Sequence, residues 1–101
     1  MSINKYSISE QAIKGLNDIW IYTFQKWSKE QADRYYDLII GELEFIAGNF
    51  MIGKSAQQTR KNYRYSKIKS DLTFYKKAEN GFVEIIRILH QRMDLENRLA
   101  E

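Results

Sequence analysis

The fold of this chain is decided by residues 72–89, which read LTFYKKAENGFVEIIRIL. Two strand-like runs, residues 72–76 and 82–89, flank the dipeptide Asn80-Gly81, which is a strong signal for a tight hairpin turn. The second run is apolar at most of its positions, as is typical of a strand inside a sheet. These residues therefore predict an antiparallel hairpin whose second strand is central.

Two helices are predicted ahead of this hairpin, after a short and weak strand pattern at the start of the chain. The first helix is capped by Ser7 or Ser9 and ends near Trp27, because apolar residues recur between them at spacings of three and four. A second cap at Ser28 begins another helix almost at once, and Gly48 stops it. The sequence therefore predicts an antiparallel helical hairpin.

The remaining segments complete a single predicted domain over residues 1–101. Residues 49–59 lack a periodic pattern and are predicted to form a loop, and residues 63–68 read as the first strand of a three-stranded meander. The predicted fold class is α+β in the order β-α-α-β-β-β: a strand, the helical hairpin, then an antiparallel meander, with the helices packed on an antiparallel sheet. Because the 101 residues include no cysteine, packing alone must hold this core.

Both predicted helices carry more apolar surface than one sheet can cover, since each has a second apolar stripe beside the one that faces the sheet. If about half a dozen of these side chains are bare, covering each one releases about 1.5–3 kcal/mol, which favours a protein partner. The alternative is that the sheet and the facing helix cover both stripes. The candidate partner-binding residues are Trp20, Phe24, Trp27, Tyr35, Leu38 and Phe45.

Positive charge is concentrated in one segment of the chain. Residues 54–77 hold eight Lys/Arg and one Asp, a net charge of +7, whereas residues 1–53 and 78–101 each carry −2. Such a block attracts an acidic protein or a nucleic acid without specifying which. A solvated sheet face and edge protected by lysines explains it equally well. The predicted basic patch comprises Arg60, Lys61, Arg64, Lys67, Lys69, Lys76 and Lys77.

Motifs for nucleotide, metal or membrane binding do not hold up. Residues 48–55 read GNFMIGKS and match the phosphate-loop pattern, yet a predicted helix precedes them, whereas that motif needs a strand before it and a helix after it. One histidine and no cysteine argue against zinc. No apolar run approaches the roughly 18 residues of a membrane span, and the start of the chain lacks a signal-peptide layout. We therefore expect a cytoplasmic protein without metal, cofactor or membrane contact.

Four basic residues could handle phosphate, namely Arg64, Arg87, His90 and Arg92. Arginine holds phosphate oxygens in a bidentate manner and histidine moves a proton near neutral pH, which together suffice for metal-free cleavage of RNA through its 2′-hydroxyl. The structural alternative, which we prefer, is that His90 closes an apolar strand while Arg87 and Arg92 pair with Glu84 and Asp94.

Residues 85–94, which read IIRILHQRMD and follow TFYK at 73–76, resemble the carboxyl-terminal signature of ParE-type toxins in the RelE/ParE superfamily. Residues 6–9, YSIS, and the apolar positions of the helical hairpin resemble the start of the same family. The chain departs from the family at Lys69 and Asp71, where glycine and histidine are common. The resemblance implies a toxin of a bacterial toxin–antitoxin pair, neutralised by a cognate antitoxin whose flexible tail wraps the toxin.

Two activities are open within that superfamily. ParE-like members are non-enzymatic inhibitors of DNA gyrase, whereas RelE-like members cut messenger RNA on the ribosome, which here would use Arg64, His90 and Arg92. Because the ribonucleases typically carry a tyrosine where this chain has Arg98, the resemblance favours a gyrase inhibitor, with Arg87, His90 and Arg92 as target contacts. A basic nucleic-acid-binding module without toxicity is a third possibility.

Overall fold

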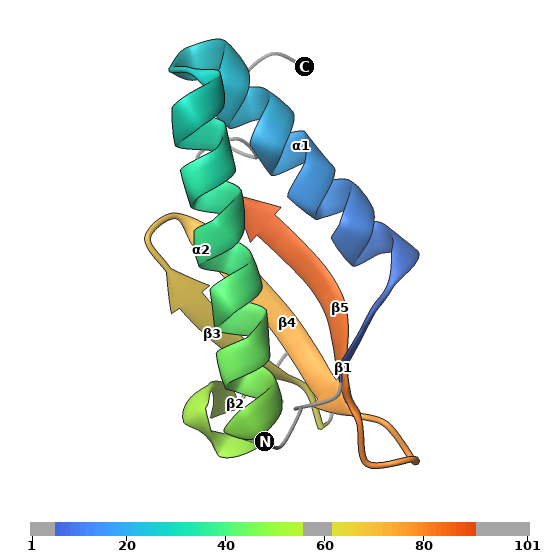
Figure 1. Ribbon diagram of the computed structural model, residues 1–101. Helices are drawn as coiled ribbons and strands as arrows, with labels where there is room; N and C mark the ends of the chain where they lie inside the picture. Colours follow the sequence, from blue (N-terminus) through green and yellow to red (C-terminus); the bar gives the residue numbers. More distant parts are fainter. Residues whose placement is uncertain (1–5, 56–61, 91–101) are drawn as a thin grey trace, which may run out of the picture.

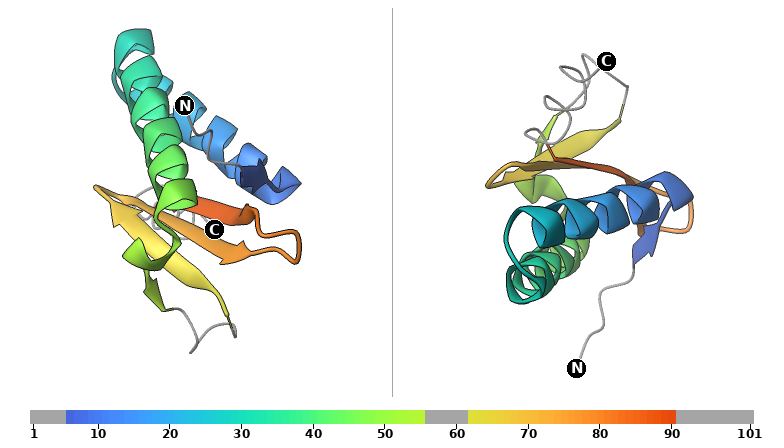
Figure 2. Two further views of the ribbon diagram at one scale, coloured as in Figure 1. Left: turned by 60° about the horizontal axis from the view of Figure 1, so that its bottom comes forward. Right: turned by 90° about the horizontal axis from the view of Figure 1, so that it is seen from above.

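The computed structural model describes residues 6–55 and 62–90 (Figure 1). Its helices are α1 (Glu10–Lys26) and α2 (Lys29–Gly48), followed by a 3-10 turn, η1 (Phe50–Ile52). Its strands are β1 (Tyr6–Ile8), β2 (Lys54–Ser55), β3 (Arg64–Ile68), β4 (Asp71–Lys77) and β5 (Val83–His90). Both helices cover one face of the sheet (Figure 2), so the predicted α+β fold is confirmed. The strands of the meander agree with their predicted bounds within one residue.

The sheet is mixed, with the strand order β1-β5-β4-β3-β2 in the described residues. β3, β4 and β5 form the predicted antiparallel meander. β1 instead pairs in parallel with β5, with Tyr6 opposite Val83 and Ile8 opposite Ile85, so the expectation of a wholly antiparallel sheet is wrong. A parallel pair needs a long connection between its strands, and here the chain runs through both helices and through β2, β3 and β4 before it reaches β5.

The predicted loop after α2 contains two short elements. The amide of Ile52 donates to the carbonyl of Asn49 at 2.9 Å, which closes η1. β2 then pairs with the start of β3, with Lys54 opposite Tyr65. The window that matches the phosphate-loop pattern therefore runs from a helix into a strand, and it offers no helix amino terminus to a phosphate.

Serine caps begin both helices. Ser9, not Ser7, caps α1: its Oγ accepts from the amide of Ala12 at 3.0 Å and donates to the carbonyl of Ile86 in β5 at 2.6 Å. Ser28 caps α2 by accepting from the amide of Gln31 at 3.1 Å. The Ser9 hydroxyl thus both starts α1 and ties it to the sheet.

The core lies between the helical hairpin and the sheet. α1 approaches β5 so closely that a Cβ added at Gly15 would lie 2.2 Å from the carbonyl oxygen of Ile88. The buried apolar cluster contains Ala12, Leu16 and Ile19 of α1, Ile39, Leu43 and Ile46 of α2, and Tyr75, Val83, Ile85 and Ile88 of the sheet.

Candidate functional site

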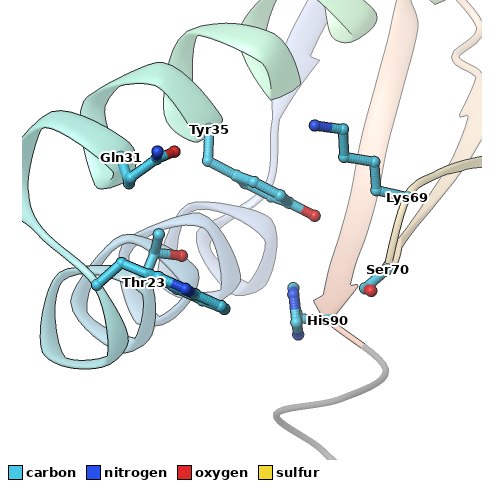
Figure 3. A pocket seen from close by; sticks show the side chains of 7 residues that line it. Thr23, Gln31, Tyr35, Lys69, Ser70 and His90 are labelled. Atoms are coloured by element: carbon cyan, nitrogen blue, oxygen red, sulfur yellow. The ribbon is translucent and has the colours of Figure 1, made fainter.

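A cavity of about 300 Å³ lies where the two helices meet the end of the sheet (Figure 3). In Figure 3 the ring of Tyr35 reaches in from α2, and its hydroxyl points between Lys69 and His90. The side chains that line the cavity are those of Thr23, Trp27, Gln31, Tyr35, Lys69, Ser70 and His90. Polar and aromatic groups from both helices, the β3–β4 turn and β5 therefore share one space.

A buried carboxyl group adjoins this cavity. The hydroxyl of Tyr35 donates a hydrogen bond to Oδ1 of Asp71, and Asp71 is only 2% exposed. Burial raises the pKa of Asp71 to about 6; nearby Glu42 adds to this rise, whereas the Tyr35 donor and Lys69 oppose it. The pKa of the Tyr35 hydroxyl is raised well above its ordinary value, mainly by burial and to a smaller extent by the hydrogen bond to Asp71. Tyr35 therefore stays protonated and remains a donor.

The predicted target-contacting residues lie in different surroundings. His90 closes β5 and is buried, with its ring centroid 5.3 Å from that of Tyr22 and 5.9 Å from that of Tyr35. Arg87 lies opposite Phe74 and is exposed. Arg92 lies outside the described residues. Of this set, Arg87 is open to a partner in the isolated chain, whereas His90 contacts the aromatic rings beside the cavity.

Arg64 and His90, two members of the alternative nuclease set, are not brought together. Arg64 pairs with Tyr75 on β4, and His90 pairs with Asp71 on the other side of that strand. From a strand spacing of about 4.8 Å and a rise of about 3.3 Å per residue, their Cα atoms lie roughly 16 Å apart.

The guanidinium group of Arg64 is directed into the loop after α2. Its Nη2 donates to the carbonyl of Met51 at 3.1 Å and to the carbonyl of Gly53 at 2.6 Å. The same group lies 5.8 Å from the ring centroid of Phe50. These contacts give Arg64 a structural role at the end of the sheet away from His90.

The candidate partner-binding side chains do not form one patch. Trp20 and Phe24 of α1 stack with ring centroids 5.4 Å apart, and Nε1 of Trp20 donates to Asp33 of α2 at 3.0 Å. Leu38 and Phe45 lie about 120–140° around the α2 axis from Asp33, at about 100° per residue. They therefore lie on the flank of α2 that faces away from α1.

Apolar surface is nevertheless available on the helical hairpin. The exposed fractions are 59% for Trp27, 50% for Phe45, 47% for Phe24 and 39% for Leu38. Trp20 and Tyr35 are half-buried, and Tyr35 points inward to the cavity. The expectation that these helices carry more apolar surface than their sheet covers agrees with these fractions.

The predicted basic patch also divides. Because side chains alternate along a strand, Lys67 and Lys76 point away from the helices, whereas Arg64 and Lys77 lie on the helix side, where both contact the ring of Phe50. Lys69 lies in the β3–β4 turn at the cavity. Arg60 and Lys61 lie outside the described residues. The charge of this segment is therefore distributed over both faces of the sheet.

The family is decided by comparison with known proteins. A family model described as "ParE toxin of type II toxin-antitoxin system, parDE" matches residues 6–95. The chain belongs to the ParE toxin family. Toxin ParE1 of Caulobacter vibrioides is 36% identical over 95 residues, which cover 94% of this chain and 97% of that protein. Toxin ParE1 of Mycobacterium tuberculosis is 31% identical over 96 residues, which cover 95% and 98%.

A solved structure supports the same fold for this ParE-family toxin. The chromosomal ParDE TA system from P. aeruginosa contains a chain that superposes with a TM-score of 0.75 at 13% identity, covering 87% of this chain and 96% of that chain. The resemblance to ParE toxins seen in the sequence is confirmed by the family match. Membership of a type II toxin–antitoxin family implies a cognate antitoxin as partner.

Two negative findings apply to the described part of this ParE-family toxin. Residues 6–55 and 62–90 contain no cluster of three or more acidic or histidine side chains placed to hold a metal ion. Neither helix in those residues has the length and apolar composition needed to cross a bilayer.

Two features of the toxin were missed by sequence reasoning. The first is the burial of Asp71, which the sequence presents only as the single acidic residue in the basic segment 54–77. Its signal was present, because Asp71 shares the inward face of β4 with Thr73 and Tyr75. The second is the exposure of Met51 and Ile52, for which the aperiodic loop sequence offers no signal.

Proposed function

We propose that this ParE-family toxin acts in the cytoplasm by binding DNA gyrase and inhibiting it, without catalysing a reaction itself. The observation that favours this proposal over the ribonuclease alternative is the position of Arg64. Its guanidinium is engaged by the carbonyls of Met51 and Gly53, and its backbone lies roughly 16 Å from that of His90. Cleavage of RNA would need a cation and a proton-transfer group on one phosphodiester, and this pair does not supply them.

We also propose that the cognate antitoxin covers the exposed apolar side chains of the helical hairpin. A disordered acidic tail with an amphipathic segment would bury those side chains and complement the cations of the basic patch. Since the aromatic residues divide between α1 and the far flank of α2, a tail that wraps the hairpin fits them better than a compact domain. The residues proposed to contact it are Trp20, Phe24, Trp27, Tyr35, Leu38 and Phe45.

The test uses two assays on the purified full-length toxin. One measures supercoiling of relaxed plasmid by gyrase, and the other follows a labelled message in a translating extract. We expect inhibited supercoiling and an intact message. A cleaved message with normal supercoiling would instead support a ribosome-dependent endoribonuclease that uses Arg64, His90 and Arg92. Neither effect, together with normal growth of a host that expresses the chain, would contradict toxicity.

A further inference from the structure

The loop after α2 holds two apolar side chains out from the fold. Met51 is 71% exposed and Ile52 is 58% exposed. Both belong to η1, the light-green turn at the lower end of α2 in Figure 1. We call this pair the loop knob. Exposed apolar side chains favour a partner when they stand together on one protrusion.

The loop knob is held rigidly from beneath. The hydroxyl of Tyr75, a fully buried residue, donates to the carbonyl of Phe50 and accepts from the amide of Gly53, each at 2.9 Å. Arg64 binds the carbonyls of Met51 and Gly53. A Cβ at Gly53 would lie 2.2 Å from the Tyr75 hydroxyl oxygen, so only glycine fits there. The buried Tyr75 and the half-buried Arg64 therefore fix the loop, and little conformational entropy is lost when it binds.

Three basic side chains of the described residues lie next to the loop knob. Nζ of Lys77 lies 5.1 Å from the ring centroid of Phe50, which Arg64 also contacts. Lys54 follows the loop in the chain and is exposed. A groove beside the knob, about 630 Å³ in volume, is lined by Asn49, Phe50, Met51, Ile52 and Lys77. An apolar protrusion with a basic rim complements an apolar pocket with an acidic rim.

We propose that the loop knob inserts into an apolar, acid-rimmed pocket on the folded target protein of the toxin; this inference rests on the proposed function, in which the target is a protein. A protruding pair of side chains needs a concave partner, which a folded protein offers and an extended antitoxin tail does not. A nucleic-acid backbone would gain from Lys54 and Lys77 but not from two exposed apolar side chains.

The α1 part of the proposed antitoxin surface lies far from the loop knob, whereas Phe45, one turn before the end of α2, lies near it. The stacked pair Trp20 and Phe24 meets α2 at Asp33. From Asp33 to Asn49 the helix advances about 24 Å, at about 1.5 Å per residue. A partner on that aromatic pair therefore does not have to touch the loop knob.

The experiment compares the full-length toxin with the double variant Met51→Ser/Ile52→Ser. The matched control for toxicity is Ile21→Ser, because Ile21 is 48% exposed on α1, is not part of the loop knob and is not among the six residues proposed to contact the antitoxin. Growth arrest on expression, inhibition of gyrase supercoiling, antitoxin affinity and the unfolding midpoint are measured for each. We expect the double variant to lose growth arrest and to need at least about ten times more protein to inhibit gyrase. Its antitoxin affinity and unfolding midpoint should match those of the wild type.

Each other outcome decides a separate question. A wild-type toxin that arrests growth without inhibiting gyrase refutes the proposed target; the loop knob inference then stands if the double variant no longer arrests growth. A folded double variant that arrests growth like the wild type overturns the inference. It is also overturned if antitoxin affinity falls while toxicity is kept, or if the variant loses binding to an RNA or DNA oligonucleotide instead. The single variants Met51→Ser and Ile52→Ser replace the double one if it fails to fold.

Discussion

Replacing Gly15 by alanine tests how closely α1 lies on β5. The new Cβ would lie 2.2 Å from the carbonyl oxygen of Ile88, whereas ordinary contact begins near 3.4 Å, so the helix or the strand has to move by about 1.2 Å. Overpacking typically costs about 1–3 kcal/mol, and we expect the upper end because a backbone carbonyl cannot rotate away. The helix propensity of alanine returns about 0.5–1 kcal/mol, which leaves a net loss near 2 kcal/mol.

Gly41→Ala is the matched control, because Gly41 is exposed in α2 and a Cβ there meets nothing within 4 Å. Gly41→Ala should gain only the stability that the helix propensity of alanine provides, so the unfolding free energies of the two variants should differ by about 3 kcal/mol. In a domain of this size 1 kcal/mol shifts the thermal midpoint by about 4–8 °C, so their midpoints should differ by more than about 10 °C. Urea and thermal unfolding followed by circular dichroism measure this difference. Equal midpoints, or a higher one for Gly15→Ala, would refute the close approach of α1 to β5.

Three further predictions concern the cavity, the turn and the hairpin. Burial raises the pKa of Asp71 to about 6 in the folded state, against about 3.9 in the unfolded chain. The stability that the neutral carboxyl contributes is therefore fully present below pH 4 and is lost as the pH rises through 6. Between pH 4 and 7 the wild type should therefore lose about 2–3 kcal/mol of unfolding free energy that Asp71→Asn does not lose, as measured by urea unfolding. A difference between the two proteins that stays constant with pH would contradict the raised pKa. Lys69 has a φ of 50°, so Lys69→Gly should be neutral or stabilising by up to about 1 kcal/mol, whereas Lys67→Gly inside β3 should cost about that much; the reverse order would count against the turn. Phe45→Lys should weaken antitoxin binding at least about tenfold in a titration while leaving the unfolding midpoint nearly unchanged, because Phe45 is 50% exposed; equal losses of binding and stability would argue for a core role.

Local chemistry in the sequence was sufficient for the meander and the helices. The hairpin forms as predicted, but its turn is centred on Glu79 and Asn80, one residue earlier than expected: the amide of Gly81 donates to the carbonyl of Ala78 at 3.0 Å. Gly81 follows with a φ of 85°, and the amide of Ala78 donates to the carbonyl of Phe82 at 2.8 Å. The cap at Ser28 and the apolar spacing of α2 likewise depend on neighbours in the chain. Interactions of this kind involve residues only a few positions apart, so they can be predicted from a single sequence.

Features set by distant contacts were not predictable in the same way. β1 is three residues long and finds β5 through contacts such as that of Ser9 with Ile86, 77 positions later. Helical periodicity gives the angle between two side chains on one helix, but not the rotation of that helix against its neighbour. For this reason the exposure of Phe24 and Phe45 could be expected, whereas their separation onto two flanks could not.

Buried polar groups at both ends of β4 connect the two candidate surfaces to one strand. At its start Asp71 accepts from Tyr35 beside the cavity, and near its end Tyr75 holds the carbonyl of Phe50 and the amide of Gly53 beneath the loop knob. Buried polar groups are costly unless they are satisfied, so each contact fixes the backbone around it. The central strand of this small sheet therefore does more than fill the core: it positions the cavity at one end of the molecule and a rigid apolar protrusion at the other.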